Sequence, residues 1–345
     1  MNTLIIRVDG NIDIGTGHFM RCLSLAQYWQ KNGGKIYFVM NNPQSLEDKI
    51  FSEDMCLIKL DEVPASQDDA LKVIDVFNKL NGDWLVVDGY HFKSDYINFI
   101  KKNNINLLLF DDEGQLDNYS ADIILNQNLH ANSINYTSVE EYTKLLLGTN
   151  YVLLRKEFLK YLDYEKPIKK IATNVLVTLG GSDKNNYSLK VLKAIDCIGD
   201  DSINIIVLLG SKNIHKQSIL DFIDESNVNI TLLQNIDDMP NKMKWADLAF
   251  SSGGTTVWEL AFMGVPVIVG GTSHIEEVLI EGLNKNNLFK TITQLDEIDE
   301  LDLTEVIREV IYDENLRKVM NCDGKKFVDG FGCSRVYKTM IENKS

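Results

Sequence analysis

The segment DIGTGHFMRC (residues 13–22) follows an apolar run and precedes a helix-like pattern, which predicts a loop at the carboxyl end of a strand. We expect Gly15 and Gly17 to allow positive φ and close backbone approach, beside a helix start whose N–H groups suit an anion. His18 stands at that start, where the helix dipole favours the neutral imidazole that acts as a general base. We expect Arg21, one turn later, to face the same pocket. The alternatives are a structural histidine and a solvated arginine.

This loop does not fit two common phosphate-binding patterns. A dinucleotide fingerprint needs a third glycine where Met20 stands, and an acidic residue ending the second strand, where asparagine stands. The chain also contains no G-x-x-x-x-G-K-[ST] segment, which excludes a P-loop NTPase. The loop is therefore interpreted as part of a site in which a base acts.

A second polar loop, VVDGYHF (86–92), ends another strand of the same expected sheet. We expect Asp88 to orient His18 or to bind a ligand hydroxyl, and Tyr90 to contact the ligand. His91 offers a further ionisable group. The alternative is that Asp88 caps a helix or forms a turn.

Two more polar loops follow neighbouring strands. FDDEGQL (110–116) carries adjacent carboxylates, which form a turn, or a metal site if further ligands converge on them. ILNQNLH (124–130) contains Asn126, Gln127 and Asn128, whose amides suit the hydroxyl and amide groups of a ligand. An ordinary polar loop is the alternative for this second segment.

The second half has two glycine-rich loops, TLGGSDKNN (178–186) and SSGGTTVWEL (251–260), each directly after a strand. The second supplies amides and hydroxyls at a helix N-terminus, which suits a diphosphate. Glu259, one turn into that helix, is placed to accept two hydroxyls of a ribose. The candidate nucleotide-binding residues of these loops are Gly181, Ser182, Gly253, Gly254, Thr255, Thr256 and Glu259.

Short apolar runs alternate with amphipathic stretches along the whole chain, which is typical of α/β folds with parallel sheets. Runs such as LVVD and LLLF do not alternate with polar residues, so both faces of that sheet are expected to be covered. In the first half the expected strands are 4–8, 35–40, 57–60, 83–88, 106–110, 122–125 and 145–147, and the expected helices are 17–31, 45–52, 68–80 and 94–103.

A charged, proline-containing segment at 160–173 is the expected linker, and a second series follows it. Its strands are 174–179, 203–209, 228–233, 247–251 and 265–269, and its helices are 186–197, 213–225, 238–245, 255–263, 275–285, 313–328 and 333–343. We predict an N-terminal Rossmann-like domain over 1–165, a C-terminal one over 170–325, and a segment 326–345 that packs back on the first. Two doubly wound parallel-sheet domains would face each other across a cleft, with ligands beyond the carboxyl ends of the strands.

Composition limits the class of protein. The 345 residues, 44% hydrophobic and 25% charged, are those of an ordinary globular chain, and the net charge of −15 argues against broad binding to nucleic acid. Five cysteines without C-x-x-C spacing favour a reducing compartment and signal neither zinc nor disulfides. Without a signal-peptide pattern or an apolar stretch of roughly 20 residues, we expect a cytoplasmic protein that does not insert into membranes.

The motifs resemble those of the nucleotide-sugar hydrolases of the pseudaminic acid pathway, in the same order and over nearly the full chain. The matching segments are GTGHFMRCLSLA, VVDGYHF, DD at 111–112, ILNQN, LLGTNYVLLRKEF (146–158), TLGGSD, SSGGTTVWELAFMGVPVIV and DGFGCSRV (329–336). That family is similar in fold to GT-B glycosyltransferases. It hydrolyses UDP-2,4-diacetamido-2,4,6-trideoxy-β-L-altropyranose to UDP and the free sugar without a metal. The resemblance implies a GT-B-like fold, a small-molecule UDP-sugar as partner, and no cofactor.

By position, His18 matches the catalytic histidine of that family. Tyr90 and the NQN loop match its substrate side, to which Arg155 of LLGTNYVLLRKEF is added, and Gly254, Thr255, Thr256 and Glu259 match the segment that holds UDP. The chain departs from the family after GVPVIV, where GGTSHIEEV (270–278) replaces an Asn-Gln pair. His274 is the candidate nucleotide-side residue there, and Glu276 stands beside it.

The resemblance implies hydrolysis at the anomeric carbon, with inversion and His18 as the general base. A diphosphate leaves as a weakly basic anion, so one base suffices. The alternatives are a GT-B UDP-sugar transferase, an inactive nucleotide-sugar-binding protein, and a hydrolase for a related UDP-sugar, which the TSHIEE departure favours. The sequence does not indicate an oligomeric state, and a monomer is compatible with it.

Overall fold

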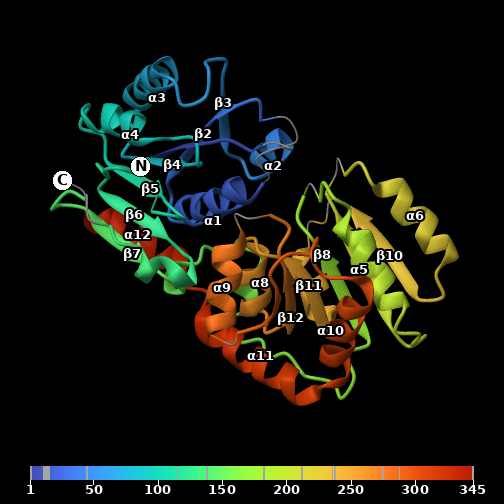
Figure 1. Ribbon diagram of the computed structural model, residues 1–345. Helices are drawn as coiled ribbons and strands as arrows, with labels where there is room; N and C mark the ends of the chain where they lie inside the picture. Colours follow the sequence, from blue (N-terminus) through green and yellow to red (C-terminus); the bar gives the residue numbers. More distant parts are fainter. Residues whose placement is uncertain are drawn as a thin grey trace. The chain divides into compact units, whose positions relative to one another are not determined.

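The computed structural model describes residues 2–10, 16–43, 46–114, 116–136, 139–181, 183–210, 213–234, 236, 238–273, 276–286 and 288–343. The chain forms two compact units. Unit 1 contains Met1–Lys156 and Gly330–Ser345, and unit 2 contains Glu157–Asp329. Each unit has one parallel sheet with helices packed against it (Figure 1), so the predicted α/β class is confirmed.

The sheet of unit 1 is built from β1 (Thr3–Val8), β2 (Lys35–Asn41), β3 (Cys56–Leu60), β4 (Trp84–Asp88), β5 (Leu107–Phe110), β6 (Ile123–Asn126) and β7 (Lys144–Leu147). Their order is β3-β2-β1-β4-β5-β6-β7, and neighbouring strands run parallel. β1 is buried along its whole length, as a strand covered on both faces must be. The strand order reverses between β1 and β4, so their carboxyl ends flank the switch point where α/β sheets bind ligands.

The helical segments of unit 1 are α1 (Gly17–Lys31), α2 (Glu47–Ser52), α3 (Gln67–Lys79), α4 (Ser94–Lys101), η2 (Leu129–Ser133), η3 (Thr149–Tyr151) and α12 (Gly332–Glu342). One apolar cluster joins the sheet to α1 and α12 through Trp29, Phe38 and Val336. A second cluster joins the opposite face to α3 and α4 through Phe77 and Ile97. The two faces of this sheet therefore have separate cores.

The sheet of unit 2 is built from β8 (Asn174–Thr178), β9 (Asn204–Leu209), β10 (Asn229–Gln234), β11 (Leu248–Ser252), β12 (Val267–Gly270) and β13 (Lys290–Ile292). Their order is β10-β9-β8-β11-β12-β13, again with parallel neighbours. The order reverses between β8 and β11. The two glycine-rich loops that follow these strands therefore flank the switch point of unit 2.

The helical segments of unit 2 are η4 (Leu159–Tyr161), α5 (Tyr187–Asp196), α6 (Lys216–Glu225), α7 (Met239–Trp245), α8 (Thr256–Phe262), α9 (Glu277–Lys285), α10 (Glu300–Tyr312) and α11 (Glu314–Phe327). The strands and helices expected from the sequence are present, with ends shifted by a few residues. The elements β13 and α10 and the short segments η2, η3 and η4 were not expected. In the described part of the chain, no helix has the length and apolar character needed to cross a membrane.

The segment expected as a linker, 160–173, makes contacts with the rest of unit 2. The Tyr161 hydroxyl donates to Oδ1 of Asn241 on α7 at 2.7 Å. Lys166 is buried, and its Nζ donates to the carbonyl oxygen of Lys244 at 3.0 Å. The division between the units therefore falls at Lys156, earlier than the boundary of 165 drawn from composition.

Candidate active site

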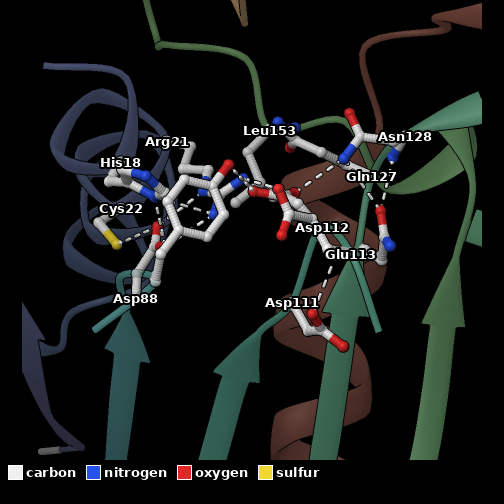
Figure 2. A network of polar contacts seen from close by, with 12 residues as sticks. His18, Arg21, Cys22, Asp88, Asp111, Asp112, Glu113, Gln127, Asn128 and Leu153 are labelled. Atoms are coloured by element: carbon white, nitrogen blue, oxygen red, sulfur yellow. Dashed lines mark hydrogen bonds and ion pairs between the residues drawn. The ribbon is translucent and has the colours of Figure 1, made fainter. Parts of the chain in front are cut away.

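His18 lies in the first turn of α1, and its ring faces Asp88 at the end of β4 (Figure 2). The Nδ1 atom of His18 is 2.7 Å from Oδ1 of Asp88. Both side chains are buried, with 9% of His18 and 0% of Asp88 exposed. The fold thus brings together two predicted residues that stand 70 positions apart in the sequence.

Arg21 joins this pair to a second carboxylate. Its Nε and Nη2 donate to the two oxygens of Asp88 at 2.6 and 2.7 Å, and its Nη1 donates to both oxygens of Asp112 at 2.9 and 2.8 Å. This is the forked pairing for which the planar guanidinium is suited. The guanidinium carbon also lies 4.6 Å from the centroid of the Phe110 ring. Arg21 is therefore an internal cation of unit 1 and not a solvated helix arginine.

The charges in this cluster follow from its burial and its pairing. Burial favours the neutral acid, but the charge of Arg21 and the hydrogen bonds from Arg21 and His18 outweigh it and hold the pKa of Asp88 well below its usual range. Burial also opposes the charge of Arg21, yet Asp112 and Asp88 raise the pKa of Arg21 above its ordinary value. Asp88 is therefore a carboxylate, which can only accept hydrogen bonds.

These contacts locate the proton on the His18 ring. Because Asp88 only accepts, the contact at 2.7 Å requires Nδ1 of His18 to carry a proton and donate it. Nη2 of Arg21 lies 3.1 Å from that nitrogen, but it donates to Asp88, since a protonated Nδ1 has no lone pair left. Among the residues that the structure describes, Nε2 of His18 has no hydrogen-bond partner. In the neutral ring that nitrogen presents a lone pair, as a general base must.

Tyr90 packs against the His18 ring. The two rings meet edge to face, with centroids 4.8 Å apart and an interplanar angle of 84°. The Tyr90 hydroxyl donates to Oδ2 of Asp112 at 3.3 Å. Burial and the Asp112 carboxylate raise the pKa of Tyr90 well above its ordinary value, so the hydroxyl keeps its proton at neutral pH.

The loop after β6 lies on the other side of Asp112 (Figure 2). Asn128 donates from Nδ2 to Oδ1 of Asp112 at 2.8 Å and to Oδ1 of Asn126 at 3.1 Å. Gln127 faces elsewhere and accepts from the backbone N–H of Leu153 at 3.1 Å. The predicted residues Asn126 and Asn128 therefore join the same polar cluster.

The FDDEG turn determines where Asp112 points. Oδ1 of Asp111 accepts from the backbone N–H groups of Glu113 and Gly114 at 3.1 and 3.0 Å, and its Oδ2 accepts from the Tyr119 hydroxyl at 2.6 Å. Of the two uses expected for this carboxylate pair, the structure has the turn. Within the described ranges, no three His, Cys, Asp or Glu side chains converge as a metal site would require.

In unit 2 the glycine-rich loops lie together, because β8 and β11 are paired neighbours. Gly180 has a φ of +83°, and a Cβ at this position would lie 3.8 Å from Oγ of Ser252. Gly210, after β9, comes so close to Gly181 that a Cβ at 210 would lie 1.9 Å from the Gly181 carbonyl oxygen. The backbones of three loops therefore meet at the switch point of this sheet.

The two glycine-rich loops differ at the helices that follow them. Asp183 accepts from the N–H groups of Tyr187 and Ser188 at 2.8 and 3.0 Å, which caps the first turn of α5. Thr255 is the N-cap residue directly before α8, whereas Asp183 lies three residues before the N-cap Asn186 of α5, and the side chain of Thr255 caps no N–H group. Glu259 lies in the first turn of α8, as expected. The anion-binding role expected for the α8 loop stays a prediction.

Glu276 lies against the α8 loop. Its Oε2 accepts from the N–H and the hydroxyl of Thr272 at 2.8 and 3.0 Å. A Cβ at Gly253 would lie 2.9 Å from Cβ of Glu276, so the glycine makes room for this side chain. Burial raises the pKa of Glu276 above its ordinary value. The segment that departs from the family pattern thus places a carboxyl group beside Gly253.

Several predicted site residues do not belong to the contacts described above. Gly15, Ser182 and His274 lie outside the described residues. Gly17 is the first residue of α1 and does not use the positive φ that glycine allows, and its substrate-side role stays a prediction. Arg155 is buried in unit 1, and its substrate-binding role stays a prediction.

Cys22 and Gly210 contact the predicted residues, although the sequence patterns assign them no role, and Asp112 was expected only as half of a carboxylate pair that forms a turn or a metal site. The Cys22 thiol lies on α1 and donates to Oδ2 of Asp88 at 3.5 Å. Asp112 and Gly210 each come within two residues of the end of a buried parallel strand. A glycine at such a strand end is the signal that would have found Gly210.

Known proteins resemble the chain in both sequence and fold. Residues 174–270, which include both glycine-rich loops, match the family model described as Glycosyltransferase family 28 C-terminal domain. The chain is 26% identical to the spore coat polysaccharide biosynthesis protein SpsG of Bacillus subtilis over 342 residues, which are 96% of this chain and 95% of that protein. It is 30% identical over 273 residues to the uncharacterized protein MJ1062 of Methanocaldococcus jannaschii. That match covers 77% of this chain but only 55% of the archaeal protein.

Among solved structures, the chain is similar to MurG of Acinetobacter baumannii. The TM-score is 0.66 at 14% identity, over 99% of this chain and 100% of that one. At this identity the likeness shows the fold alone. The two α/β units are those of the GT-B fold, which confirms the predicted fold class. The cleft expected between the domains stays a prediction.

Proposed function

We propose that the protein is an enzyme that hydrolyses a UDP-linked diacetamido-trideoxy sugar at its anomeric carbon, releasing UDP and the free sugar. The geometry of His18 carries this proposal, because Nδ1 is held by the buried carboxylate of Asp88 while Nε2 has no partner in the described chain. The similarity to SpsG, which is named for spore coat polysaccharide biosynthesis, supports a role in making a pseudaminic-type nonulosonic acid or a surface polysaccharide.

In the proposed step, Nε2 of His18 takes a proton from water while the water oxygen bonds to the anomeric carbon. The bond from that carbon to the β-phosphate oxygen breaks, and its electron pair leaves with UDP. The imidazolium keeps its Nδ1–H on Asp88, whose negative charge stabilises it. Because the leaving group is weakly basic, the second carboxyl group of an ordinary glycosidase is not required. Attack opposite the leaving UDP inverts the anomeric configuration.

Unit 2 would hold the nucleotide in this proposal. The loop from Gly253 to Thr256 would bind the diphosphate, and Glu259 would accept the ribose hydroxyls. The match of 174–270 to a glycosyltransferase C-terminal domain supports this assignment, since that range carries both glycine-rich loops. Backbone N–H groups around Gly254 would stabilise the negative charge that develops as UDP departs. The proposal assigns no metal and no cofactor.

The substitution His18→Asn tests the proposed base. Asn retains an N–H group near the position of Nδ1 but has no lone pair at the position of Nε2. We expect UDP release to fall by about 10²- to 10⁴-fold, with the affinity for UDP unchanged in calorimetry. Near-normal turnover would show that His18 is not the base. A loss of UDP binding would show that the substitution disturbs more than the base.

A UDP-sugar glycosyltransferase of the same fold is the second candidate, and the match to a glycosyltransferase family model favours it. Turnover of a panel of UDP-sugars in H₂¹⁸O without any acceptor separates the two. A hydrolase places ¹⁸O in the free sugar, and NMR of the new anomer reports inversion. A transferase consumes the UDP-sugar only when an acceptor is added. Binding of UDP without any turnover would identify an inactive nucleotide-sugar-binding protein.

A further inference from the structure

Asp88 at the end of β4 and His91 three residues later face opposite sides of the unit 1 sheet. Asp88 contacts His18 on the α1 side. His91 lies on the α3 and α4 side, where its Nε2 is 3.0 Å from Oδ2 of Asp9. Tyr90, between them, turns back to the α1 side and packs its ring against His18. The main chain on both sides of Tyr90 is thus held by side-chain contacts, a buried one at Asp88 and a part-buried one at His91.

Asp9 is a well-fixed partner for His91. Its Oδ1 accepts from Nη1 of Arg7 at 2.7 Å and from the backbone N–H of Asn41 at 2.8 Å. Burial opposes its charge, but the hydrogen bonds from His91 and Arg7 lower the pKa of Asp9 to about 2. Asp9 is therefore a buried carboxylate that Arg7 on β1 and Asn41 on β2 hold in addition to His91.

Gly89, directly before Tyr90, lies against the His91 ring. Gly89 has a φ of +150°, a conformation that side chains rarely adopt. A Cβ at Gly89 would lie 2.7 Å from Cε1 of His91 and 3.1 Å from Cε2 of Phe92. The His91 ring also packs on the Phe92 ring, with centroids 4.1 Å apart. The imidazole therefore occupies the space that any side chain at position 89 would need.

We propose that His91 is a positioning residue for the His18 chemistry. Anchored to Asp9, it fixes the main chain on one side of Tyr90, while Asp88 fixes the other side. The Tyr90 ring is thereby set against the His18 ring from the opposite face of the sheet. His91 acts on His18 through Tyr90. This inference rests on the proposed function in one respect, namely that UDP release is the reaction whose rate His91 affects.

A double-mutant cycle tests this proposal. His91→Phe keeps a ring beside Phe92 but removes the donor to Asp9. We expect kcat for UDP release to fall about tenfold with KM little changed, because the base is displaced while substrate binding is not. In a Tyr90→Ala background the same substitution should change kcat by about twofold or less. Equal losses in both backgrounds are what a purely structural role predicts, and they would overturn the proposal.

Two further variants keep the test decisive. His91→Gln returns an N–H donor to Asp9 and should restore most of the rate that His91→Phe loses. Gly89→Ala displaces the His91 ring by direct contact, and it replaces His91→Phe in the cycle if that variant does not fold. Failure of His91→Gln to restore any of the rate would contradict a role through the Asp9 contact.

NMR of ¹⁵N-histidine-labelled protein provides a readout without turnover. His91→Phe should shift the ring signals of His18 when Tyr90 is present and leave them unchanged in Tyr90→Ala. If the protein releases UDP from no sugar but shows this coupling, the proposed function fails and the positioning role stands. If UDP is released but the cycle is additive and the His18 signals do not move, the positioning role fails alone.

Discussion

Two clusters of the same residue types lie on opposite faces of the unit 1 sheet. The α1-face cluster consists of His18, Arg21, Asp88 and Asp112, and the α3-face cluster consists of Arg7, Asp9, Asp69 and His91. In each, a buried guanidinium pairs with two carboxylates, and one of the carboxylates binds a histidine. Residue types and pairing therefore do not distinguish the two clusters, although the His91 side chain is 28% exposed and that of His18 only 10%.

The clusters differ in which ring nitrogen their histidine uses. His18 binds Asp88 through Nδ1, which leaves Nε2, the ring nitrogen farther from the main chain, for a ligand. His91 binds Asp9 through Nε2 instead, so its far nitrogen is already engaged inside the protein. The same set of residue types can thus provide a general base or a purely structural contact. The orientation of the imidazole determines which of the two it provides.

The α3-face cluster joins three elements of unit 1. Asp69 on α3 accepts from Nε and Nη2 of Arg7 on β1 at 3.0 and 2.7 Å. It also accepts from the Tyr96 hydroxyl on α4 at 2.9 Å. Because Arg7 and Asp69 are both 0% exposed, we expect this pairing to matter for folding more than for the chemistry of His18.

The largest expected effect is on stability, and it separates the two clusters when one aspartate of each is replaced. Asp69→Ala removes one partner of a buried ion pair and should lower the free energy of unfolding by about 3–5 kcal/mol. Its folded fraction should keep its kcat within a few fold, because Arg7 still holds Asp9. Asp88→Ala is the matched variant on the other face and should lose UDP release as well. Urea denaturation and low-temperature turnover measure both, and unchanged stability in Asp69→Ala would refute the structural role.

A smaller effect concerns the free energy of unfolding at acid pH. The pKa of Asp9 is lowered from 3.8 to about 2, so its stabilising contribution is present above its unfolded pKa and is lost as the pH falls through about 2. This shift corresponds to about 2 kcal/mol. Between about pH 5 and about pH 2, wild type should therefore lose about 2 kcal/mol more than Asp9→Asn. Parallel losses in the two proteins would place the acid sensitivity elsewhere.

The smallest expected effect concerns Asp112. Asp112→Asn keeps the size of the side chain but removes the charge that Nη1 of Arg21 faces, so we expect kcat/KM to fall about tenfold. Asp117→Asn makes the same charge change at an exposed position of the same loop and serves as the control. Equal losses in the two variants would indicate a general effect of loop charge.

Most elements of the fold could be predicted, because buried parallel strands and amphipathic helices leave strong patterns. The helix α10 was missed although its signals are present. Asp299 caps it by accepting from the N–H of Asp302, and Leu303, Ile307 and Ile311 form its buried stripe. The strand β13 has three residues, too few to show any periodicity.

The candidate site could be predicted in part. His18, Asp88 and Tyr90 follow from the rule that ligands meet the carboxyl ends of parallel strands, and the structure brings them together. The role of Asp112 could not be predicted, because either aspartate of a DD pair can form the turn. Only the hydrogen bonds of Asp111 within that turn leave Asp112 directed toward Arg21.

The sequence by itself determined the parallel α/β order of this protein and the loops at its strand ends, since local periodicity and turn residues encode both. Tertiary structure alone decided which face each loop residue takes and which nitrogen of each histidine is engaged. The contact between His18 and Asp88 spans 70 positions, and that between His91 and Asp9 spans 82. Such contacts depend on how the sheet and its helices pack, and packing over that distance leaves no local pattern.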